Sequence, residues 1–87
     1  MEWREVREQY PHRWVVVEVF EAHSEQGERI IEQMSVVGAF GDEWDDAWAS
    51  YKRVHHQDMS REYYVLHTDI TELNIEEFDV FRRSLAE

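Results

Sequence analysis

The segment Trp14–Phe20 constrains the fold of this chain most strongly, because it is the densest cluster of β-branched and aromatic residues in the sequence. Such residues favour the pleated, packed surface of a β-sheet. In an extended strand one face carries Val15, Val17 and Val19. The opposite face carries Trp14, Val16, Glu18 and Phe20. Both faces are mostly apolar, which predicts a central strand covered on at least part of each side.

The chain of 87 residues predicts a single small domain, 1–87. A chain of this length buries roughly 60–65% of the surface that its unfolded form exposes, so its core must be efficient. The four Trp, four Tyr and four Phe supply much area per residue, and 43% hydrophobic residues place the chain outside the disordered class. Because the core is small, we expect association that hides further apolar surface.

The net charge of −11 restricts the partners of this protein. Nucleic-acid binding relies on Lys and Arg to neutralise phosphates, and no basic cluster is longer than Lys52-Arg53 or Arg82-Arg83. We therefore expect neither a nucleic acid nor an anionic membrane as a partner. The acidity fits a highly soluble protein or one that binds a basic protein.

The absence of cysteine from the sequence excludes disulfides, thiolate nucleophiles and Cys-type zinc sites. The first residues, Met1–Glu5, lack a basic leader followed by an apolar run, so we expect no signal peptide. No apolar run approaches the roughly 20 residues that a membrane-spanning helix needs. A reducing, cytoplasmic location is therefore expected.

A short helix and a long hairpin are predicted in the first half of the chain. Residues 2–10 place Trp3, Val6 and Tyr10 on one helical stripe, and Pro11 ends it. We expect this helix to dock on the sheet through Trp3 and Tyr10. The central strand should run to about residue 23, turn over residues 24–28 with Gly27 at positive φ, and return over residues 29–40.

A well-formed helix should begin at Gly41-Asp42 and end near Gln57-Asp58. Apolar residues recur at helical spacing, acidic residues crowd its start, and basic residues lie near its end. Asp42 is the expected N-cap. The third strand, Glu62–His67, should then return parallel to the second strand and antiparallel to the first if those two are neighbours. Gly38 permits a bulge or a close backbone approach.

The tail from Asn74 onward has two readings, an amphipathic helix or an edge strand with a bulge, and the periodicity slightly favours the helix. The predicted class is thus α+β in the order αββαβ plus this tail. The sheet should have three or four strands, with the helices packed mainly on one face.

Three sequence pieces, Tyr10-Pro11-x-x-Trp14-Val15, Glu21–Ser24 and Arg61–Thr68, resemble a family of small uncharacterised bacterial proteins, mostly from Gram-positive species. The resemblance covers about residues 3–77, and its motifs are mainly structural. It implies a short helix, a hairpin, a helix and a further strand, with a more strand-like segment after Leu73. The family has no established activity, so the resemblance assigns no site residue.

Two groups of residues are candidates for metal or acid–base chemistry. Glu21 and His23 share one face of the first strand, and His67 on the third strand falls near Glu18 or Glu21 if the strands are neighbours. The alternative is an ordinary cross-strand surface pair. The second group, His55-His56-x-Asp58, lacks the i, i+4 spacing of helical metal ligands, and we interpret it as imidazoles favoured by a helix C-terminus.

The aromatic residues are the remaining candidates. A domain this small cannot easily cover all of its Trp and Tyr, and exposed Trp and Tyr typically anchor interfaces. Trp44, Trp48 and Tyr51 share one helical stripe, and such a stripe is most often part of the core. The residues selected as interface anchors are Trp44, Trp48, Tyr63 and Tyr64. The serines and glycines form no nucleophile elbow and no phosphate loop.

From the sequence we therefore expect a non-enzymatic protein-interaction domain, either a homodimer or a domain with another protein partner, and no cofactor. The alternative is a metal-binding or hydrolytic protein that uses Glu21, His23 and His67.

Overall fold

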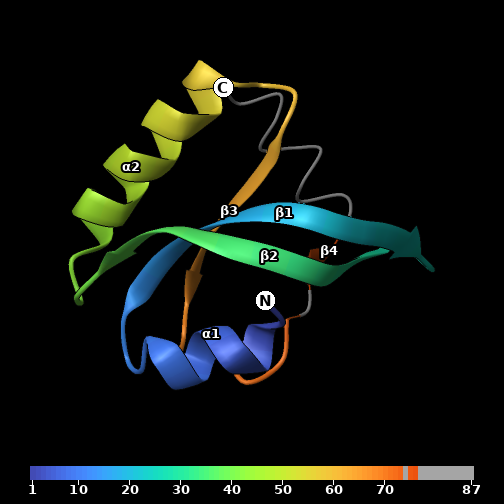
Figure 1. Cartoon of the computed structure of the whole chain (residues 1–87), viewed down its shortest axis with the longest axis horizontal. Coiled ribbons are helices and arrows are strands. Elements are labelled where there is room, and N and C mark those ends of the chain that lie inside the picture. The colour runs from blue at the N-terminus through green and yellow to red at the C-terminus, as the bar shows by residue number, and fades with distance from the viewer. Residues whose placement is uncertain (74, 77–87) are drawn as a thin grey trace.

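A computed structural model of the chain describes residues 1–73 and 75–76 (Figure 1). In chain order its elements are helix α1 (Trp3–Gln9), strands β1 (Trp14–Glu25) and β2 (Glu28–Phe40), helix α2 (Trp44–Gln57), and strands β3 (Glu62–His67) and β4 (Ile75–Glu76). The predicted α+β class and the αββαβ order are confirmed.

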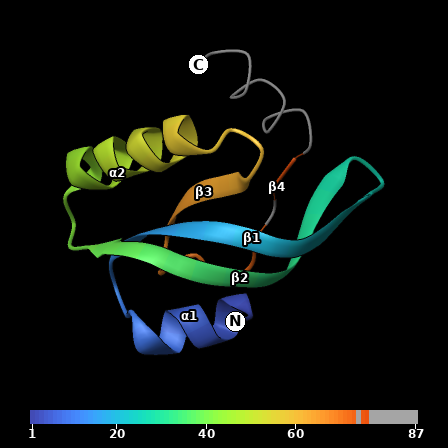
Figure 2. The same cartoon turned by 45° about the horizontal axis from the view of Figure 1, so that its top comes forward.

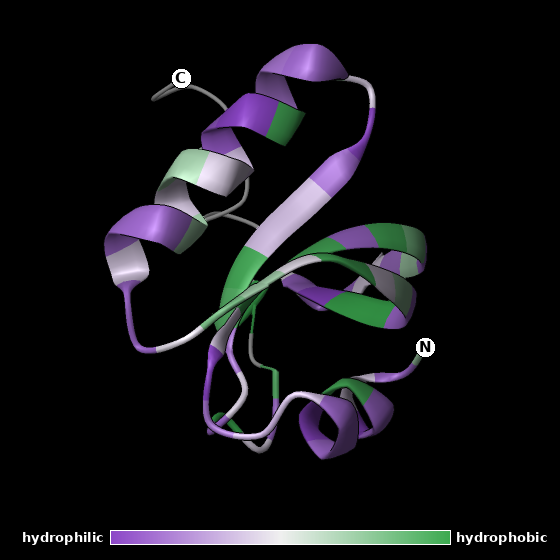
Figure 3. Cartoon of the chain, turned by 60° about the vertical axis from the view of Figure 1, so that its left-hand side comes forward, coloured by the Kyte–Doolittle hydropathy of each residue, from purple (hydrophilic) through white to green (hydrophobic). Residues whose placement is uncertain are grey.

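The strands form one antiparallel sheet in the order β3-β1-β2-β4, so β1 lies inside it. Trp14 at the start of β1 pairs with Phe40 of β2 on one side and with His67 of β3 on the other. Because β2 and β3 are both antiparallel to β1, they run parallel to each other, as expected for strands joined through a helix. The valine-rich segment is therefore the central strand, as predicted. Coloured by hydropathy, the strands of the sheet carry long hydrophobic stretches, whereas both helices carry many hydrophilic residues (Figure 3).

The two helices cover opposite faces of this sheet (Figure 2). Val15 and Val17 pack in a cluster with Trp3 of α1, whereas Val16 packs in a second cluster with Tyr51 of α2. The expectation that the helices pack mainly on one face is wrong. Strand alternation sends apolar side chains of β1 to both faces, and each face needs its own cover.

Helix α1 docks through Trp3 and Tyr10, as its apolar stripe predicts. Trp3 is only 9% exposed, and its indole Nε1–H donates to the backbone carbonyl of Ile70 at 2.8 Å. At the start of the helix, the Glu5 carboxylate accepts a hydrogen bond from the backbone N–H of Glu2 at 3.1 Å. That bond satisfies one of the donors that a helix N-terminus leaves unpaired.

Helix α2 begins one residue later than its capping pattern predicts. Its N-cap is Glu43, whose side chain makes no capping hydrogen bond, so the expected cap at Asp42 is wrong. The Asp42 carboxylate instead points toward two imidazoles, those of His12 and His67. The helix ends at Gln57, as predicted.

The β1–β2 hairpin closes in a tight turn at Gln26-Gly27, where φ is 51° at the first residue and 80° at the second. Positive φ at both residues is typical of the two-residue turns that match the twist of a hairpin. The prediction of positive φ at Gly27 is confirmed. The turn sets the register that brings the apolar residues of β2 back alongside β1.

Gly38 on β2 lies beside a β-bulge, because the pairing with β1 shifts by one residue between Val16 and Val17. It is also a close-approach position. A Cβ at Gly38 would lie 3.0 Å from the ring of Phe40 and 3.3 Å from Ser50 Oγ. The missing side chain therefore allows α2 to lie close against β2.

The described part of the tail is strand rather than helix. Ile75–Glu76 form β4, which pairs antiparallel with Glu28 and Arg29 of β2. The helical stripe predicted beyond these residues, over 77–87, lies outside the described part of the chain. Neither helix of the described residues combines the length and the apolar composition that a bilayer crossing requires.

An ion pair joins β2 to β3 across the sheet. The Arg29 guanidinium donates to both carboxylate oxygens of Glu62, at 3.0 Å from Nε and 2.7 Å from Nη2, and the Tyr64 hydroxyl donates to the same carboxylate. Burial acts to raise the pKa of Glu62, but the hydrogen bonds from Arg29 and Tyr64 outweigh burial and leave that pKa below its ordinary value. The ionised carboxylate therefore stabilises the folded state.

Replacing Gly38 with alanine should lower the free energy of unfolding by about 1–2 kcal/mol, because the new methyl group overpacks the contact with Phe40 and Ser50. The measurement is urea unfolding followed by tryptophan fluorescence. Gly41→Ala is the matched control, since nothing lies within 4 Å of a Cβ there. It should be neutral or slightly stabilising, and equal effects at the two glycines would refute the close approach.

Replacing Glu62 with glutamine should lower the free energy of unfolding at pH 7 by about 2 kcal/mol, because a charge-assisted pair with Arg29 is lost. A lowered folded pKa gives stability that is present above the unfolded pKa and is lost as pH falls through the folded one. The difference between the two proteins should therefore shrink below about pH 4.3.

Urea unfolding at a series of pH values measures this difference. Glu8→Gln, at an exposed position of α1, is the control and should change the stability little at any pH. A Glu62→Gln protein whose deficit stays constant down to about pH 2 would contradict the assigned role of the carboxylate.

Candidate functional site

Aromatic and imidazole rings form a continuous row from α2 to the end of β3. The ring of Trp44 stacks on Trp48 with centroids 5.7 Å apart, and Trp48 stacks on Tyr51 at 5.2 Å. Trp14 meets Trp44 edge-on at 4.7 Å and His67 edge-on at 4.9 Å. Favourable ring pairs have centroids about 4.5–7 Å apart, so these side chains hold one another in place.

This aromatic row passes from the core to the surface. Tyr51 is 5% exposed and Trp48 is half-buried, whereas Trp44 is 43% exposed. The α2 part of the row, Trp44, Trp48 and Tyr51, forms because residues three and four apart share one face of the helix. Trp44 is therefore a large apolar side chain that is both held by neighbours and open to solvent.

Carboxylates flank Trp44 in the sequence, and all of them are exposed: Asp42, Glu43, Asp45 and Asp46. The basic residues of α2, Lys52 and Arg53, lie in its C-terminal half. The exposed indole thus has an apolar centre and a strongly negative surrounding. A surface of this kind attracts cationic groups.

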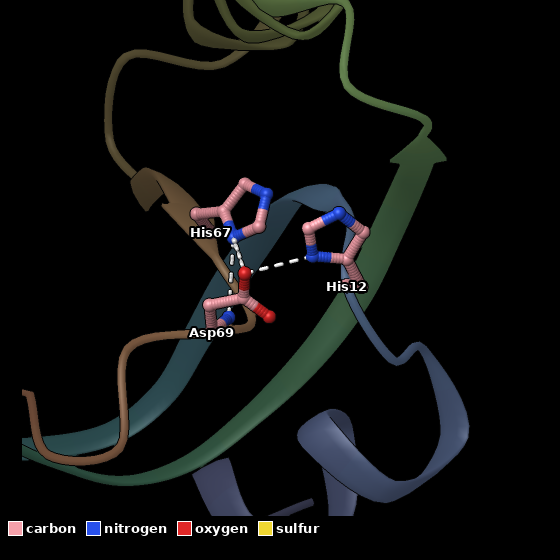
Figure 4. A group of neighbouring side chains, drawn as sticks. All are labelled: His12, His67 and Asp69. Atoms are coloured by element: carbon pink, nitrogen blue, oxygen red, sulfur yellow. Dashed lines mark hydrogen bonds and ion pairs between the residues drawn. The ribbon is translucent and has the colours of Figure 1, made fainter.

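Four polar side chains meet at the neighbouring corner of the sheet, and we call them the His–Asp corner: His12, Asp42, His67 and Asp69. Figure 4 draws three of them, His12, His67 and Asp69. They come from the loop between α1 and β1, the loop between β2 and α2, and the end of β3. Backbone hydrogen bonds fix this meeting point, including Thr68 N–H to the carbonyl of Arg13 at 3.0 Å.

Each carboxylate of the His–Asp corner faces both imidazoles. Asp69 Oδ2 lies 2.7 Å from His12 Nδ1 and 3.7 Å from His67 Nδ1 (Figure 4). On the other side, Asp42 Oδ1 lies 3.6 Å from His12 Nε2 and 3.8 Å from His67 Nε2. The two rings meet edge-on with centroids 5.5 Å apart. The two Nδ1 atoms thus face one carboxylate and the two Nε2 atoms face the other.

The electrostatics of the corner favour a charged His12. Its hydrogen bond to Asp69, the negative charge of Asp69 and that of Asp42 raise the pKa of His12 above its ordinary value. His12 also has a φ of 50°, a left-handed conformation that few residues other than glycine adopt. On the second imidazole, Nδ1 of His67 accepts a hydrogen bond from the backbone N–H of Asp69 at 3.1 Å.

One ligand atom from each of His12, His67 and Asp69 lies within 4.8 Å of the others, a spacing from which small side-chain rotations reach metal-coordination distances. Two imidazoles and a carboxylate are common ligands of Zn²⁺ and related ions. Holding a divalent transition metal is therefore the chemistry that this corner supports most directly.

The structure does not bring together the three residues that the sequence suggested as a metal or acid–base group. His67 lies opposite Trp14 at the start of β1, and His23 lies near its far end, opposite Ile30. Nine strand positions at about 3.3 Å each span up to roughly 30 Å of β1, so His23 and His67 lie at opposite ends of that strand. Glu21 lies on the distal half of β1 as well, so the antiparallel register separates Glu21 and His23 from His67.

His23 has its own partners at the distal end of the hairpin. Its Nδ1 lies 2.9 Å from Glu32 Oε1 and its Nε2 lies 3.3 Å from Glu25 Oε2. His23 is thus an imidazole between two surface carboxylates, the cross-strand alternative considered from the sequence.

The anchor residues selected from the sequence fall into two classes. Trp44 and Trp48 belong to the aromatic row, and Tyr63 is half-buried beside the α2 cluster. Tyr64, in contrast, is 2% exposed in the α1 cluster, with its hydroxyl directed to Glu62. Its selection as a surface contact is wrong, because alternation along β3 sends adjacent tyrosines to opposite faces.

The sequence His55-His56-x-Asp58 does not converge on one point. The two rings have centroids 6.0 Å apart and are inclined by 66°. The Asp58 carboxylate is bound by its neighbours, through Ser60 N–H at 3.1 Å and Arg61 Nε at 2.9 Å. These contacts form the end of α2 and the start of the loop to β3.

A groove lies on the α1 side of the sheet, between α1, β2 and residues 71–73, and charged residues of both signs line it. Two of its arginines already have partners within the protein. Arg7 Nε donates to the carbonyl of Thr68 at 2.8 Å, and Arg29 binds Glu62. Small-molecule pockets are mostly apolar with a few convergent polar groups, and this groove has a different character.

No sequence signal marked His12, Asp42 and Asp69 as one group, because they are far apart along the chain and Asp42 was interpreted as a helix cap. The one available clue was indirect. An antiparallel β1–β3 pair with Trp14 opposite His67 places the residues just before β1 beside those just after β3. That register could not be read from residue type.

Comparison of the chain with protein-family models, with curated proteins and with solved structures finds no match. The resemblance described from the sequence therefore stays a prediction.

Replacing Asp69 with asparagine should lower the pKa of His12 toward its ordinary value of 6.5, because the mutation removes the carboxylate that raises it most. The measurement is an NMR titration of the His12 imidazole. Asp45→Asn removes another exposed carboxylate, on the first turn of α2, and should leave the titration unchanged. A wild-type pKa for His12 at or below 6.5 would contradict the geometry of the corner.

Proposed function

We propose that this chain is a non-enzymatic protein-interaction domain of the cytoplasm and that its contact surface is centred on Trp44. One observation carries this proposal: the indole is 43% exposed although ring contacts with Trp14 and Trp48 hold it in place. Interface hot spots are enriched in tryptophan. A side chain that is ordered before binding loses little conformational entropy when a partner covers it.

The charges around Trp44 favour a basic segment of another protein as the partner. A guanidinium or ammonium group can lie over the indole face, and neighbouring basic residues can pair with the exposed carboxylates of residues 42–46. Two copies of this chain meeting here would oppose like charges, and each copy carries −11. The homodimer expected from the sequence is therefore the second occupant to test.

A titration with a synthetic peptide of alternating Arg, Lys and Gly tests the proposal, with tryptophan fluorescence as the signal. We expect binding that weakens as salt is added, because charge pairs at an exposed surface are screened. Trp44→Ala should weaken binding about tenfold or more, the effect typical of an interface anchor. A peptide of the same length with Glu in place of Arg and Lys should not bind.

Ile70→Ala is the matched control, since Ile70 is 44% exposed and its backbone contacts Trp3 on the α1 side. It should bind the basic peptide as the wild type does. Equal binding by wild type and Trp44→Ala would refute the contact surface.

Light scattering without peptide distinguishes a basic protein partner from a second copy of the chain. We expect a monomer at protein concentrations of tens of micromolar. A dimer that dissociates when Trp44 is replaced with alanine would identify a second copy of the chain, and not a basic segment, as the partner of this surface.

A further inference from the structure

The geometry points to a metal site for a divalent transition ion, with Zn²⁺ the best fit, formed by His12 Nδ1, His67 Nδ1 and the carboxylate of Asp69 (Figure 4). This inference does not depend on the proposed interaction function. It differs from the metal alternative raised by the sequence, because Glu21 and His23 take no part and His12 and Asp69 do.

The distances come close to those of a coordination sphere. Zn²⁺ lies about 2.0–2.2 Å from nitrogen and oxygen ligands, so ligand atoms of a tetrahedral site are roughly 3.3 Å apart. Asp69 Oδ2 is 2.7 Å from Nδ1 of one imidazole and 3.7 Å from Nδ1 of the other. The ligand–ligand separation of a tetrahedral Zn²⁺ site lies between these two distances. Small side-chain rotations of the exposed His12 and Asp69 complete the site.

The Asp42 carboxylate lies on the Nε2 side of both imidazoles, just beyond direct hydrogen-bond distance. An imidazole that binds a metal through one nitrogen almost always donates its other N–H to a carboxylate or a carbonyl. Here both Nε2 atoms face the same oxygen, Asp42 Oδ1, at 3.6 Å from His12 and 3.8 Å from His67. Coordination through Nδ1 leaves both Nε2 atoms protonated, so each N–H points toward a negative charge.

The ion must replace two hydrogen bonds. One joins His12 Nδ1 to Asp69 Oδ2 at 2.7 Å, and coordination through this Nδ1 releases its proton to solvent. Nδ1 of His67 accepts the backbone N–H of Asp69 at 3.1 Å. The lone pair that accepts this bond is the one that would bind the ion. Metal binding therefore frees the Asp69 amide, and this change provides a local spectroscopic signature.

The ligand set selects among ions. Ca²⁺ and Mg²⁺ prefer six or more oxygen ligands, which two imidazoles and one carboxylate do not provide. Imidazole suits Zn²⁺, Cu²⁺, Ni²⁺ and Co²⁺, and three protein ligands leave a fourth position of a tetrahedral Zn²⁺ open. His12 and Asp69 are exposed, so that position faces solvent.

The ion would link segments that are distant in the sequence. His12 precedes β1, whereas His67 and Asp69 lie at the end of β3. A ligand that binds the folded state and not the unfolded one raises the stability in proportion to the logarithm of its concentration above the dissociation constant. Small domains commonly gain stability from such a metal.

The experiment adds Zn²⁺ to untagged protein and follows thermal unfolding together with ¹H–¹⁵N NMR spectra. We expect Zn²⁺ to raise the unfolding midpoint by several degrees and Mg²⁺ to leave it unchanged. The imidazole signals of His12 and His67 and the backbone amide of Asp69 should shift together. His12→Asn and Asp69→Asn should each weaken Zn²⁺ binding at least tenfold in calorimetric titration.

Both substitutions are chosen to preserve the fold. Asparagine tolerates the left-handed φ of position 12, and Asp69→Asn keeps the shape and the backbone N–H of that residue. His23→Asn is the matched control, because His23 is also an imidazole between two carboxylates, Glu25 and Glu32. This control should bind Zn²⁺ at the His–Asp corner as the wild type does.

Three results would overturn the assignment. They are no thermal shift with excess Zn²⁺, a shift that His12→Asn and Asp69→Asn leave intact, and Zn²⁺-induced NMR changes confined to His23 or to His55 and His56.

Discussion

The structure depends on burial of the β1 valines from both sides. Val15, Val16 and Val17 are fully buried, and full burial of one such side chain is worth about 1.5–3 kcal/mol. A single helix cannot cover two faces of a sheet, so this strand requires both α1 and α2. The tryptophan of α1 and the aromatic stripe of α2 supply the complementary apolar surfaces.

This two-sided arrangement also decides where functional groups can lie. At the start of β1, both neighbouring strands pair with Trp14 at one point, and the loop before β1, the loop before α2 and the end of β3 converge there. The His–Asp corner lies at this point. Ring contacts of Trp14 with His67 and with Trp44 connect it to the exposed end of the aromatic row. The distal half of β1 extends beyond both helices, and Glu21 and His23 are exposed on it.

The elements of the fold were largely predictable, and their packing less so. Local signals marked the strands and both helices: β-branched runs, the proline after Tyr10, the glycine of the hairpin turn and the aromatic spacing of α2. The expectation of one covered face was wrong, although the apolar residues on both sides of β1 already implied two covers. The N-cap is Glu43, one residue later than expected, and the Asp42 carboxylate lies beside the imidazoles of the corner instead.

For the candidate site, the sequence by itself determined the α2 part of the aromatic row, because ring contacts along one helix follow from positions three and four apart. It also determined the negative charge around Trp44. Only the tertiary structure decided that His12, Asp42 and Asp69 join His67, and that Tyr64 is core while Trp44 is exposed. The reason is physical: a contact across a sheet depends on strand order and register, which the burial and pairing of the whole chain set together, and residue type alone does not encode them.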